Sequence, residues 1–228
     1  MVLCTTGPEP KPKSFFPSLL QRIAWLPLRI LFSWFGSLQV KGIENLQISK
    51  GPIIIASNHV SELDPLLIVA SIPFFSRHLP LFYVSRVKGQ YGKGLRNLVY
   101  GGLLFKMLGA YPAYTGLHNY EEALRHHIQI LESGGSVGIF PMGGIVLKGT
   151  DQKPKGGVVY LSQSTRAQIV PVSIKGLEGI TIKQFFRVRP KILVTYGKPI
   201  ESSLLSSYTT TNYVAGAELV MGEVSKLF

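Results

Sequence analysis

The chain has 228 residues, the size of one ordinary domain, and such a domain can bury about 70% of its unfolded surface. Hydrophobic residues make up 46% of it and charged residues only 16%, which excludes a disordered protein and favours contact with a membrane surface or an apolar substrate. The 24 basic and 12 acidic side chains give a net charge of +12, which suits anionic lipid headgroups, phosphate esters or nucleic acid.

The same sequence argues against a nucleic-acid partner and against a metal site. It has no dense Lys/Arg stripe, no zinc-finger spacing and no aromatic RNP-like signature, so we expect no nucleic acid among its partners. Cys4 is the only cysteine, which excludes an internal disulfide and a cysteine-based metal site. We expect neither a metal nor a redox cofactor, and a reducing compartment as the simplest setting.

The N-terminal part of the chain divides into a tail and an apolar segment. Residues 1–14 include the stretch PEPKPK and lack apolar periodicity, so they are predicted to form a flexible tail. Residues 15–37 are rich in Leu, Ile, Phe and Trp, but polar residues interrupt them and Pro27 is expected to bend them. A membrane-spanning helix needs about 20 largely uncharged apolar residues, and a secretory signal needs an unbroken apolar core, so neither fits.

On a helical wheel this segment has two sides. Arg22 and Arg29 fall on one side with two serines, and the other side carries Leu19, Ile23, Leu26, Ile30 and Trp34. Arginine and tryptophan are typical interface anchors, so residues 15–37 are predicted to form amphipathic helices that attach the protein to a cell membrane, peripherally or monotopically on the cytoplasmic face. The alternative is an amphipathic helix packed on the protein core.

From residue 38 onward, strand and helix signals alternate. Short runs rich in Val, Ile, Tyr or Phe predict seven strands, at 38–41, 53–57, 80–84, 110–114, 136–140, 168–174 and 191–196. Helices are predicted at 65–72, 95–108, 119–133 and 156–165, the third capped by Asn119 with Glu122 and ended by Gly134. This alternation predicts one α/β domain over residues 38–228, with a mostly parallel mixed sheet flanked by helices.

The stretch SNHVSELDP, residues 57–65, lies in the predicted turn between a strand and a helix. Pro65 suits a first helical turn and disfavours the α conformation at the residue before it, so Asp64 is predicted to cap the helix. The turn can bring His59 and Asp64 together, whereas five residues along a straight helix would separate them by about 140°. A histidine held by a carboxylate keeps one tautomer and can act as a general base. The alternative is a helix cap beside an unrelated surface histidine.

Five blocks follow one another in a characteristic order over roughly residues 38–200: NHVSELDP at 58–65, YVSR at 83–86, LGAYPAYTG at 108–116, IFPMGG at 139–144 and IVPVSIKG at 169–176. Together they resemble the glycerolipid acyltransferase superfamily, which includes 1-acylglycerol-3-phosphate acyltransferases (PlsC-like). The first block of that family is Asn-His-x-Ser-x-x-Asp, which matches at Asn58, His59, Ser61 and Asp64.

The resemblance implies a fold, a reaction and a set of site residues. The reaction is transfer of a fatty acyl group from acyl-CoA or acyl-ACP (acyl carrier protein) to the hydroxyl of 1-acylglycerol 3-phosphate, which gives phosphatidic acid in phospholipid synthesis. His59 would be the base, Asp64 would orient it, and the family blocks place the substrate near Asn58, Ser61, Arg86, Pro141 and Met142. Membrane lipid and the acyl donor are the expected partners. The chain lacks Gly-x-Ser-x-Gly, which argues against a serine hydrolase.

Two blocks depart from the family pattern. Ala113, Tyr114 and Thr115 stand where the second block usually ends in arginine, and the third block, normally Phe-Pro-Glu-Gly-Thr-Arg, has Met142 for the glutamate and Gly144–Ile145 for Thr-Arg. These changes remove cations that would hold a phosphomonoester, for which the candidate substitutes are Arg86, Lys148, Lys153 and Lys155. They favour two alternatives: an acyltransferase for a lipid acceptor without a phosphomonoester, and a catalytically weakened lipid-binding protein.

Three further positions are candidates on the strength of their own chemistry. Gly143 and Gly144 would let backbone approach a ligand and offer N–H donors, or would simply form a tight turn. Lys155 precedes a predicted helix and would meet an anion there, or would be a solvated loop lysine. The apolar stretch 98–108 would line an acyl tunnel or form ordinary core.

Overall fold

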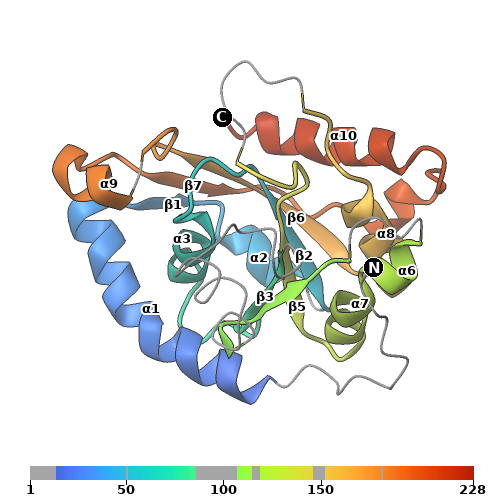
Figure 1. Cartoon of the computed structure of the whole chain (residues 1–228), viewed down its shortest axis with the longest axis horizontal. Helices are drawn as coiled ribbons and strands as arrows, with labels where there is room; N and C mark the ends of the chain where they lie inside the picture. Colours follow the sequence, from blue (N-terminus) through green and yellow to red (C-terminus); the bar gives the residue numbers. More distant parts are fainter. Residues whose placement is uncertain (1–13, 50, 86–106, 115–118, 146–151, 181) are drawn as a thin grey trace, which may run out of the picture.

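The structure is a computed structural model that describes residues 14–49, 51–85, 107–114, 119–145, 152–180 and 182–228 (Figure 1). Most of the predicted tail, most of the predicted helix 95–108, Arg86 and Lys148 lie outside the described residues. Within them, helices cover both faces of one sheet, which confirms the predicted α/β class.

In the described part of the chain, a seven-stranded sheet forms the centre, in the order β1-β7-β6-β2-β5-β3-β4. All seven predicted strands occur, with their ends shifted by at most two residues: β1 Gln39–Lys41, β2 Ile53–Ser57, β3 Leu81–Ser85, β4 Ala110–Pro112, β5 Ser136–Ile139, β6 Gln168–Lys175 and β7 Leu193–Tyr196. Only the β6–β7 pair is antiparallel among the described strands, so the sheet is mixed and mostly parallel, as predicted.

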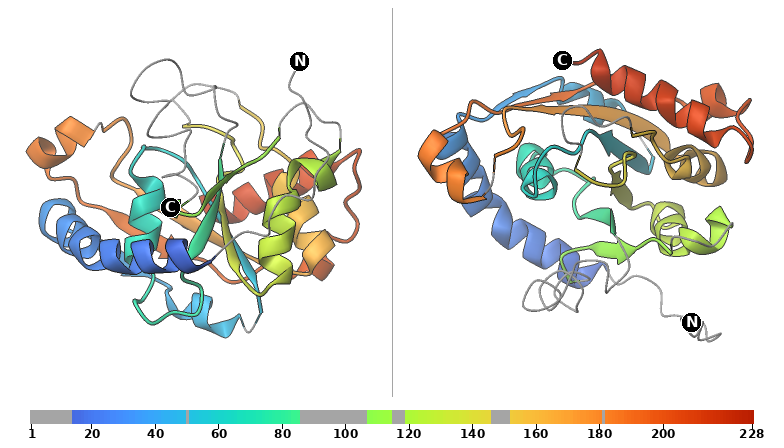
Figure 2. Two further views of the ribbon diagram at one scale, coloured as in Figure 1. Left: turned by 60° about the horizontal axis from the view of Figure 1, so that its bottom comes forward. Right: turned by 45° about the horizontal axis from the view of Figure 1, so that its top comes forward.

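Strand β2 shows why the sheet is covered on both faces. All five of its residues are buried. Successive side chains of a strand point to opposite faces, and Ile53 and Ile55 accordingly join one core cluster while Ile54 and Ala56 join the other. The left view of Figure 2 shows α1 (Phe15–Gly36) and α3 (Asp64–Ser71) on one side, and α7 (Arg125–Glu132), α8 (Gly157–Thr165) and α10 (Tyr213–Ser225) on the other.

The helices depart from the sequence prediction in several places. The predicted helix 119–133 is broken at Leu124, whose φ of −115° and ψ of 13° are not helical, into α6 (Tyr120–Ala123) and α7. Asn119 caps α6 as predicted, but its side chain accepts the amide of Glu121. The sequence did not predict α10, nor the short α2 (Glu44–Ile48), α9 (Ile182–Val188) and η1 (Ser202–Leu205).

The N-terminal segment, predicted as amphipathic helices with a bend at Pro27, is one continuous helix, α1, with Pro27 inside it. Proline has no backbone N–H, so the Ile23 carbonyl lacks its usual helical donor at Pro27. Both residues face solvent, where water can donate to this carbonyl instead. None of the described helices is long and apolar enough to cross a membrane.

One face of α1 packs on the domain. The buried Gln21 donates to the carbonyls of Leu81 (2.8 Å) and Leu108 (2.9 Å) and accepts from the Leu81 amide (2.9 Å), so it holds β3 and the residues before β4. The Trp25 indole donates to the Ile72 carbonyl at 2.7 Å, and Phe32 is fully buried. On this face, α1 is packed on the protein core, as in the alternative interpretation of the sequence.

The opposite face of α1 is exposed and apolar. The five apolar residues that the helical wheel places on this side are 46–74% exposed: Leu19, Ile23, Leu26, Ile30 and Trp34. The two arginines, expected to be interface anchors, bond to the protein. Arg22 donates to the Phe74 carbonyl, and Arg29 donates to the Ala70 carbonyl in the last turn of α3, where the helix end attracts positive charge.

Candidate active site

The first and third sequence blocks lie at the same edge of the sheet, where strands β2 and β5 end. Strands β2 and β5 pair in parallel, with Ala56 opposite Ile139, and such strands present their carboxyl ends together. His59 is the second residue after β2, and Phe140 follows β5 directly. The two rings stack at 4.1 Å between centroids with an 18° angle between their planes.

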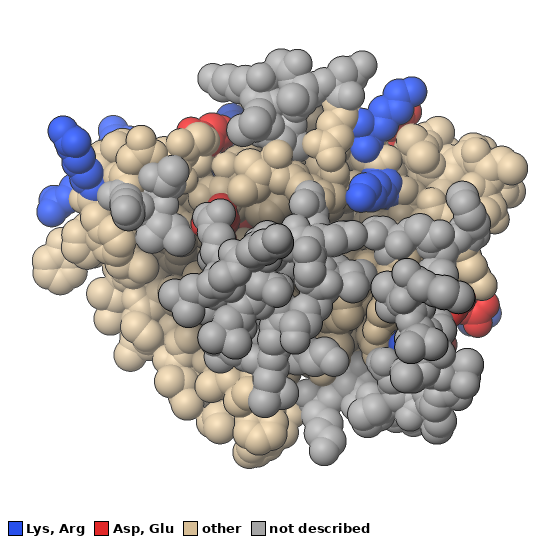
Figure 3. All heavy atoms as spheres, in the orientation of Figure 1, with Lys and Arg blue, Asp and Glu red and all other residues tan. Residues whose placement is uncertain are grey.

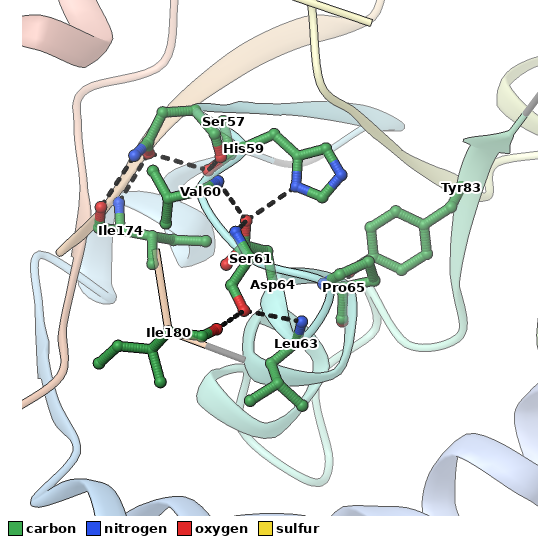
Figure 4. Close-up of polar contacts among 11 residues, drawn as sticks. Ser57, His59, Val60, Ser61, Leu63, Asp64, Pro65, Tyr83, Ile174 and Ile180 are labelled. Carbon is green, nitrogen blue, oxygen red and sulfur yellow. Dashed lines mark hydrogen bonds and ion pairs between the residues drawn. The ribbon is translucent and has the colours of Figure 1, made fainter. Parts of the chain in front are cut away.

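His59 and Asp64 form the predicted pair (Figure 4). The His59 Nδ1 lies 2.8 Å from Asp64 Oδ2, and the same oxygen accepts the backbone amides of Val60 (2.7 Å) and Ser61 (2.9 Å). Asp64 is fully buried, while the His59 side chain is 18% exposed. Because Nδ1 faces the carboxylate, the imidazole presents Nε2 on its outer side, where a substrate hydroxyl can reach it.

Asn58 and Ser61 hold the loop that carries His59. Asn58 donates its side-chain amide to the Ile174 carbonyl and accepts the Ile174 amide, both at 2.8 Å, which ties the loop to β6. The buried Ser61 hydroxyl donates to the Ile180 carbonyl at 3.4 Å and accepts the Leu63 amide at 3.3 Å. These four contacts are with protein backbone, and Asn58 Oδ1 also accepts the Ser57 hydroxyl at 3.4 Å, so both side chains support the geometry of the His59–Asp64 pair.

The third block forms a turn beside this pair. Gly143 has φ +75° and donates its amide to the Phe140 carbonyl at 2.9 Å, so this N–H takes part in the turn. The buried Pro141 accepts the Lys155 amide at 2.8 Å, which brings the loop before α8 against the block. Met142 and Gly144 are half-buried.

Lys155 lies across this turn. A methyl group built on Gly143 would fall 2.8 Å from Lys155 Cε and 2.9 Å from Lys155 Nζ, so the absence of a side chain at Gly143 makes room for the lysine. Lys155 is otherwise exposed. The structure thus brings together six of the predicted site residues from three segments: His59, Asp64, Pro141, Met142, Gly143 and Lys155.

Sequence reasoning missed an aromatic wall at this site. The Tyr83 ring of β3 lies parallel to Phe140, at 6.1 Å and 7°, and its hydroxyl donates to the Pro65 carbonyl at 2.8 Å. Burial raises the pKa of Tyr83 well above its usual value. The sequence did contain a signal of this close contact, which is the glycine within β5. A methyl group at Gly138 would fall 2.5 Å from Tyr83 Cε1.

Two histidines of α7 are buried beside the site. His126 and His127 are 5% and 0% exposed, because α7 turns them toward β3 and β4. His127 Nε2 lies 3.4 Å from the Tyr83 carbonyl. Burial lowers the pKa of His127 to about 4, and burial with the nearby Arg77 lowers that of His78 to about 4. Across the described residues, no three His, Cys, Asp or Glu side chains group as metal ligands.

The fold and the pair define a class of enzyme. A histidine oriented by a buried carboxylate at the carboxyl edge of a parallel sheet activates a hydroxyl as general base. The serines two residues before and after His59, Ser57 and Ser61, donate their hydroxyls to backbone carbonyls. This arrangement fits a transferase that moves a group directly to a substrate hydroxyl.

Comparison with known proteins assigns the family. The family model named Acyltransferase matches residues 37–175, so the chain belongs to the acyltransferase family. It is 24% identical over 156 residues to a probable 1-acyl-sn-glycerol-3-phosphate acyltransferase of Mycoplasma genitalium, covering 66% of this chain and 55% of the relative. A protein of the same name from Mycoplasma pneumoniae is 23% identical over 153 residues, covering 65% and 54%. The chain thus spans about half the length of these curated relatives.

A solved structure supports the fold. The 1-acyl-sn-glycerophosphate (LPA) acyltransferase PlsC from Thermotoga maritima superimposes with a TM-score of 0.62 at 18% identity, covering 92% of this chain and 81% of that one. The predicted superfamily is therefore confirmed by the family match and by the fold.

Proposed function

We propose that the protein transfers a fatty acyl group from the thioester of acyl-CoA or acyl-ACP to the hydroxyl of 1-acylglycerol 3-phosphate, forming phosphatidic acid in phospholipid synthesis. The observation that carries the proposal is the 2.8 Å contact between His59 Nδ1 and Asp64 Oδ2 in a chain of the acyltransferase family. The names of the two Mycoplasma relatives support this acceptor.

The geometry suits direct transfer in two proton steps. His59 Nε2 takes the proton of the acceptor hydroxyl as its oxygen attacks the thioester carbonyl. Asp64 holds the imidazole in the required tautomer and stabilises the imidazolium. The tetrahedral intermediate then expels the thiolate, which takes up the proton from His59, so that the ester and the free thiol leave and the enzyme is restored.

The acceptor side of the proposed site is built by the third block and Lys155. The family arginine is absent here, and Lys155 is a cation that lies directly on the Met142–Gly144 turn. An ammonium group suits a phosphate as a point charge. Lys155 is therefore the proposed contact to the phosphomonoester of the acceptor.

Met142 favours a second candidate function. Its half-buried thioether carries no charge and accepts hydrogen bonds only weakly, where the family has a glutamate. An acceptor lipid without a phosphomonoester, which packs an apolar part against Met142, would fit this side chain. A protein that binds lipid with weakened catalysis would carry the same substitution.

The proposed location is a cell membrane, peripheral or monotopic on the cytoplasmic face, with membrane lipid and the acyl donor as partners. Support comes from the exposed apolar face of α1 and from the net charge of +12. The segment would lie in the interface plane with this face among the acyl chains.

The proposed function is tested by measuring thiol release from acyl-CoA and from acyl-ACP with and without an acceptor. We expect release that depends on 1-acylglycerol 3-phosphate and is much slower with 1-acylglycerol, which lacks the phosphate. Release that prefers 1-acylglycerol would support the second candidate, and no acceptor-dependent release with either donor would contradict an acyltransferase activity.

A further inference from the structure

The helix α9 is fastened to the C-terminal end of α1. Phe185 is 1% exposed and meets Phe32 of α1 edge to face, with 5.7 Å between ring centroids. Phe186 meets Phe35 of α1 in the same manner at 5.3 Å. Figure 1 and both views of Figure 2 show α9 beside this end of α1. The two helices therefore present their outer faces together.

Apolar side chains continue from α1 onto α9. Phe186 is 48% exposed and Val188 57%, and at the adjoining end of α1 Ile30 is 51% and Trp34 74% exposed. Phe35 of α1, which contacts Phe186, joins the two sets. A contiguous exposed apolar patch of this kind is an interaction site more often than other parts of a protein surface are.

This part of the surface is also strongly basic. Residues 182–191, IKQFFRVRPK, contain four cations and no acidic residue. Arg187, Arg189 and Lys191 are exposed, and the Arg189 guanidinium lies 5.5 Å from the centre of the Phe35 ring. Figure 3 shows Lys and Arg gathered at the end of the molecule that carries α9. A second copy of the chain would bring like charges together on this face, whereas an anionic lipid surface would complement them.

We propose that α9 is a second membrane contact, in which Phe186 and Val188 enter the lipid interface while Arg187, Arg189 and Lys191 bind anionic headgroups. The inference rests on the membrane association proposed above for α1 and adds a second point of attachment. One helix lying in the interface leaves the domain free to roll about the helix axis, and a second contact removes this freedom.

The second contact also fixes the height of the active site above the lipid. Residue 182, where α9 begins, is two residues beyond Ile180, whose carbonyl accepts the Ser61 hydroxyl in the loop between His59 and Asp64. The lipid contact and the catalytic loop are thus joined by a short stretch of chain, which suits an enzyme whose acceptor is a membrane lipid.

The test compares two double variants of α9 with matched controls on α10 and elsewhere. Phe186→Ser with Val188→Ser removes the apolar pair, and Val214→Ser with Leu219→Ser removes a pair of similar exposure from α10. Arg187→Gln with Lys191→Gln removes two charges, and Lys198→Gln with Lys226→Gln is the control for charge. Flotation is measured with vesicles of phosphatidylcholine alone and with 30% phosphatidylglycerol, and melting transitions verify folding.

We expect the apolar α9 variant to lose about tenfold or more in affinity for both vesicle types, because two half-exposed side chains leave the interface. The charge variant should lose about fivefold per residue on the anionic vesicles only. The control variants should bind as the wild type does.

Equal binding by the α9 variants and their controls would overturn the proposal. So would a wild-type dimer in sedimentation that the apolar α9 variant converts to monomer without loss of vesicle binding, because the face would then be an interface between copies. Transfer to detergent-dispersed acceptor is measured beside flotation and should be retained in the α9 variants. Absence of transfer in the wild type would contradict the proposed function and leave the vesicle result intact.

Discussion

The ammonium group of Lys155 lies over the α-carbon of Gly143, at a point where a methyl group on that glycine would be 2.9 Å from Lys155 Nζ. The contact joins the loop before α8 to the third sequence block, and the Lys155 amide fixes it from the backbone side by donating to Pro141 at 2.8 Å. A cation is thereby held beside the block from which the family arginine is missing.

Lys155→Met is expected to raise the KM for 1-acylglycerol 3-phosphate by about tenfold, near the low end for a hydrogen bond to a charged group because the side chain is exposed. The KM for 1-acylglycerol should not change. Lys198→Met is the control, since it removes the same charge from an exposed lysine that is not a candidate for phosphate binding. If the two variants have the same kinetics with both acceptors, Lys155 does not bind the phosphate.

His59→Ala is expected to lower the transfer rate by roughly 10²-fold or more, the usual worth of a positioned base. Asp64→Asn should also be severe, because an amide nitrogen next to the His59 ring favours the wrong tautomer. Glu62→Gln, on the same loop but exposed, is the control and should keep the wild-type rate. Initial rates are compared for variants whose melting transition is unchanged. Transfer at the wild-type rate by the His59 variant would contradict this mechanism.

Much of this architecture was predictable because it depends on local patterns. The run IIIAS of β2 is long enough and apolar enough to be a buried strand wherever it pairs. The His59–Asp64 contact follows from a turn of known type between that strand and a helix started by Pro65. In both cases the determining residues are neighbours in the sequence.

Other features depend on contacts between distant segments, which no local pattern contains. Arg22 and Arg29 are typical interface anchors, yet Arg22 donates to the Phe74 carbonyl beyond α3 and Arg29 to the Ala70 carbonyl in the last turn of α3. The Tyr83–Phe140 stack needs the register of β3 beside β5. The helix α10 has glycines at 216 and 222, which weaken a helical signal, and packing supplies its stability: Gly216 lies against Val159 of α8.

The two buried histidines predict a loss of stability in mild acid. Their pKa values are about 4 in the folded chain and near 6.5 when unfolded, so between these limits the unfolded state binds more protons. The stabilisation is complete above pH 6.5, and falls by up to about 1.4 kcal/mol per pH unit for each histidine as the pH drops toward 4.

Urea unfolding of the wild type and of His78→Gln between pH 4.5 and 7.5 measures this effect. In the wild type, His78 Nδ1 lies 3.1 Å from the Ser136 hydroxyl. Glutamine keeps a polar group at this place but does not titrate. We expect a shallower fall in unfolding free energy for the variant below pH 6.5 and parallel curves above it. Parallel curves over the whole range would show that His78 does not contribute.

Vesicle binding through α1 is best tested on its exposed face alone. Deleting the helix would also uncover the core around Gln21 and Phe32, so loss of binding by such a truncation would not be specific. Ile23→Ser with Leu26→Ser changes two residues that are 64% and 57% exposed and leaves the packed face intact. We expect at least tenfold weaker flotation with vesicles than for the Val214→Ser, Leu219→Ser control. Equal flotation would contradict attachment through α1.

Met142→Glu separates the two candidate acceptors. Phe140, Pro141 and Gly143 keep the family pattern around this position, and the turn is formed, since the Gly143 amide bonds to the Phe140 carbonyl at 2.9 Å. The new carboxylate should therefore occupy the place of the family glutamate. If the site acts on 1-acylglycerol 3-phosphate with one group missing, a restored charged hydrogen bond is worth about 1.5–3 kcal/mol, and transfer should rise by roughly 10- to 150-fold.

Met142→Gln is the matched control, because it adds a polar group of similar length without the charge and should gain much less. Initial rates are measured with 1-acylglycerol 3-phosphate and with 1-acylglycerol, after the melting transitions have shown that both variants fold. A folded Met142→Glu variant whose rate with the phosphorylated acceptor is flat or lower would contradict the weakened-site explanation. The thioether would then be a contact for an apolar part of a different acceptor, and the variant should lose transfer to that lipid, because a carboxylate without a partner at this half-buried position opposes apolar binding.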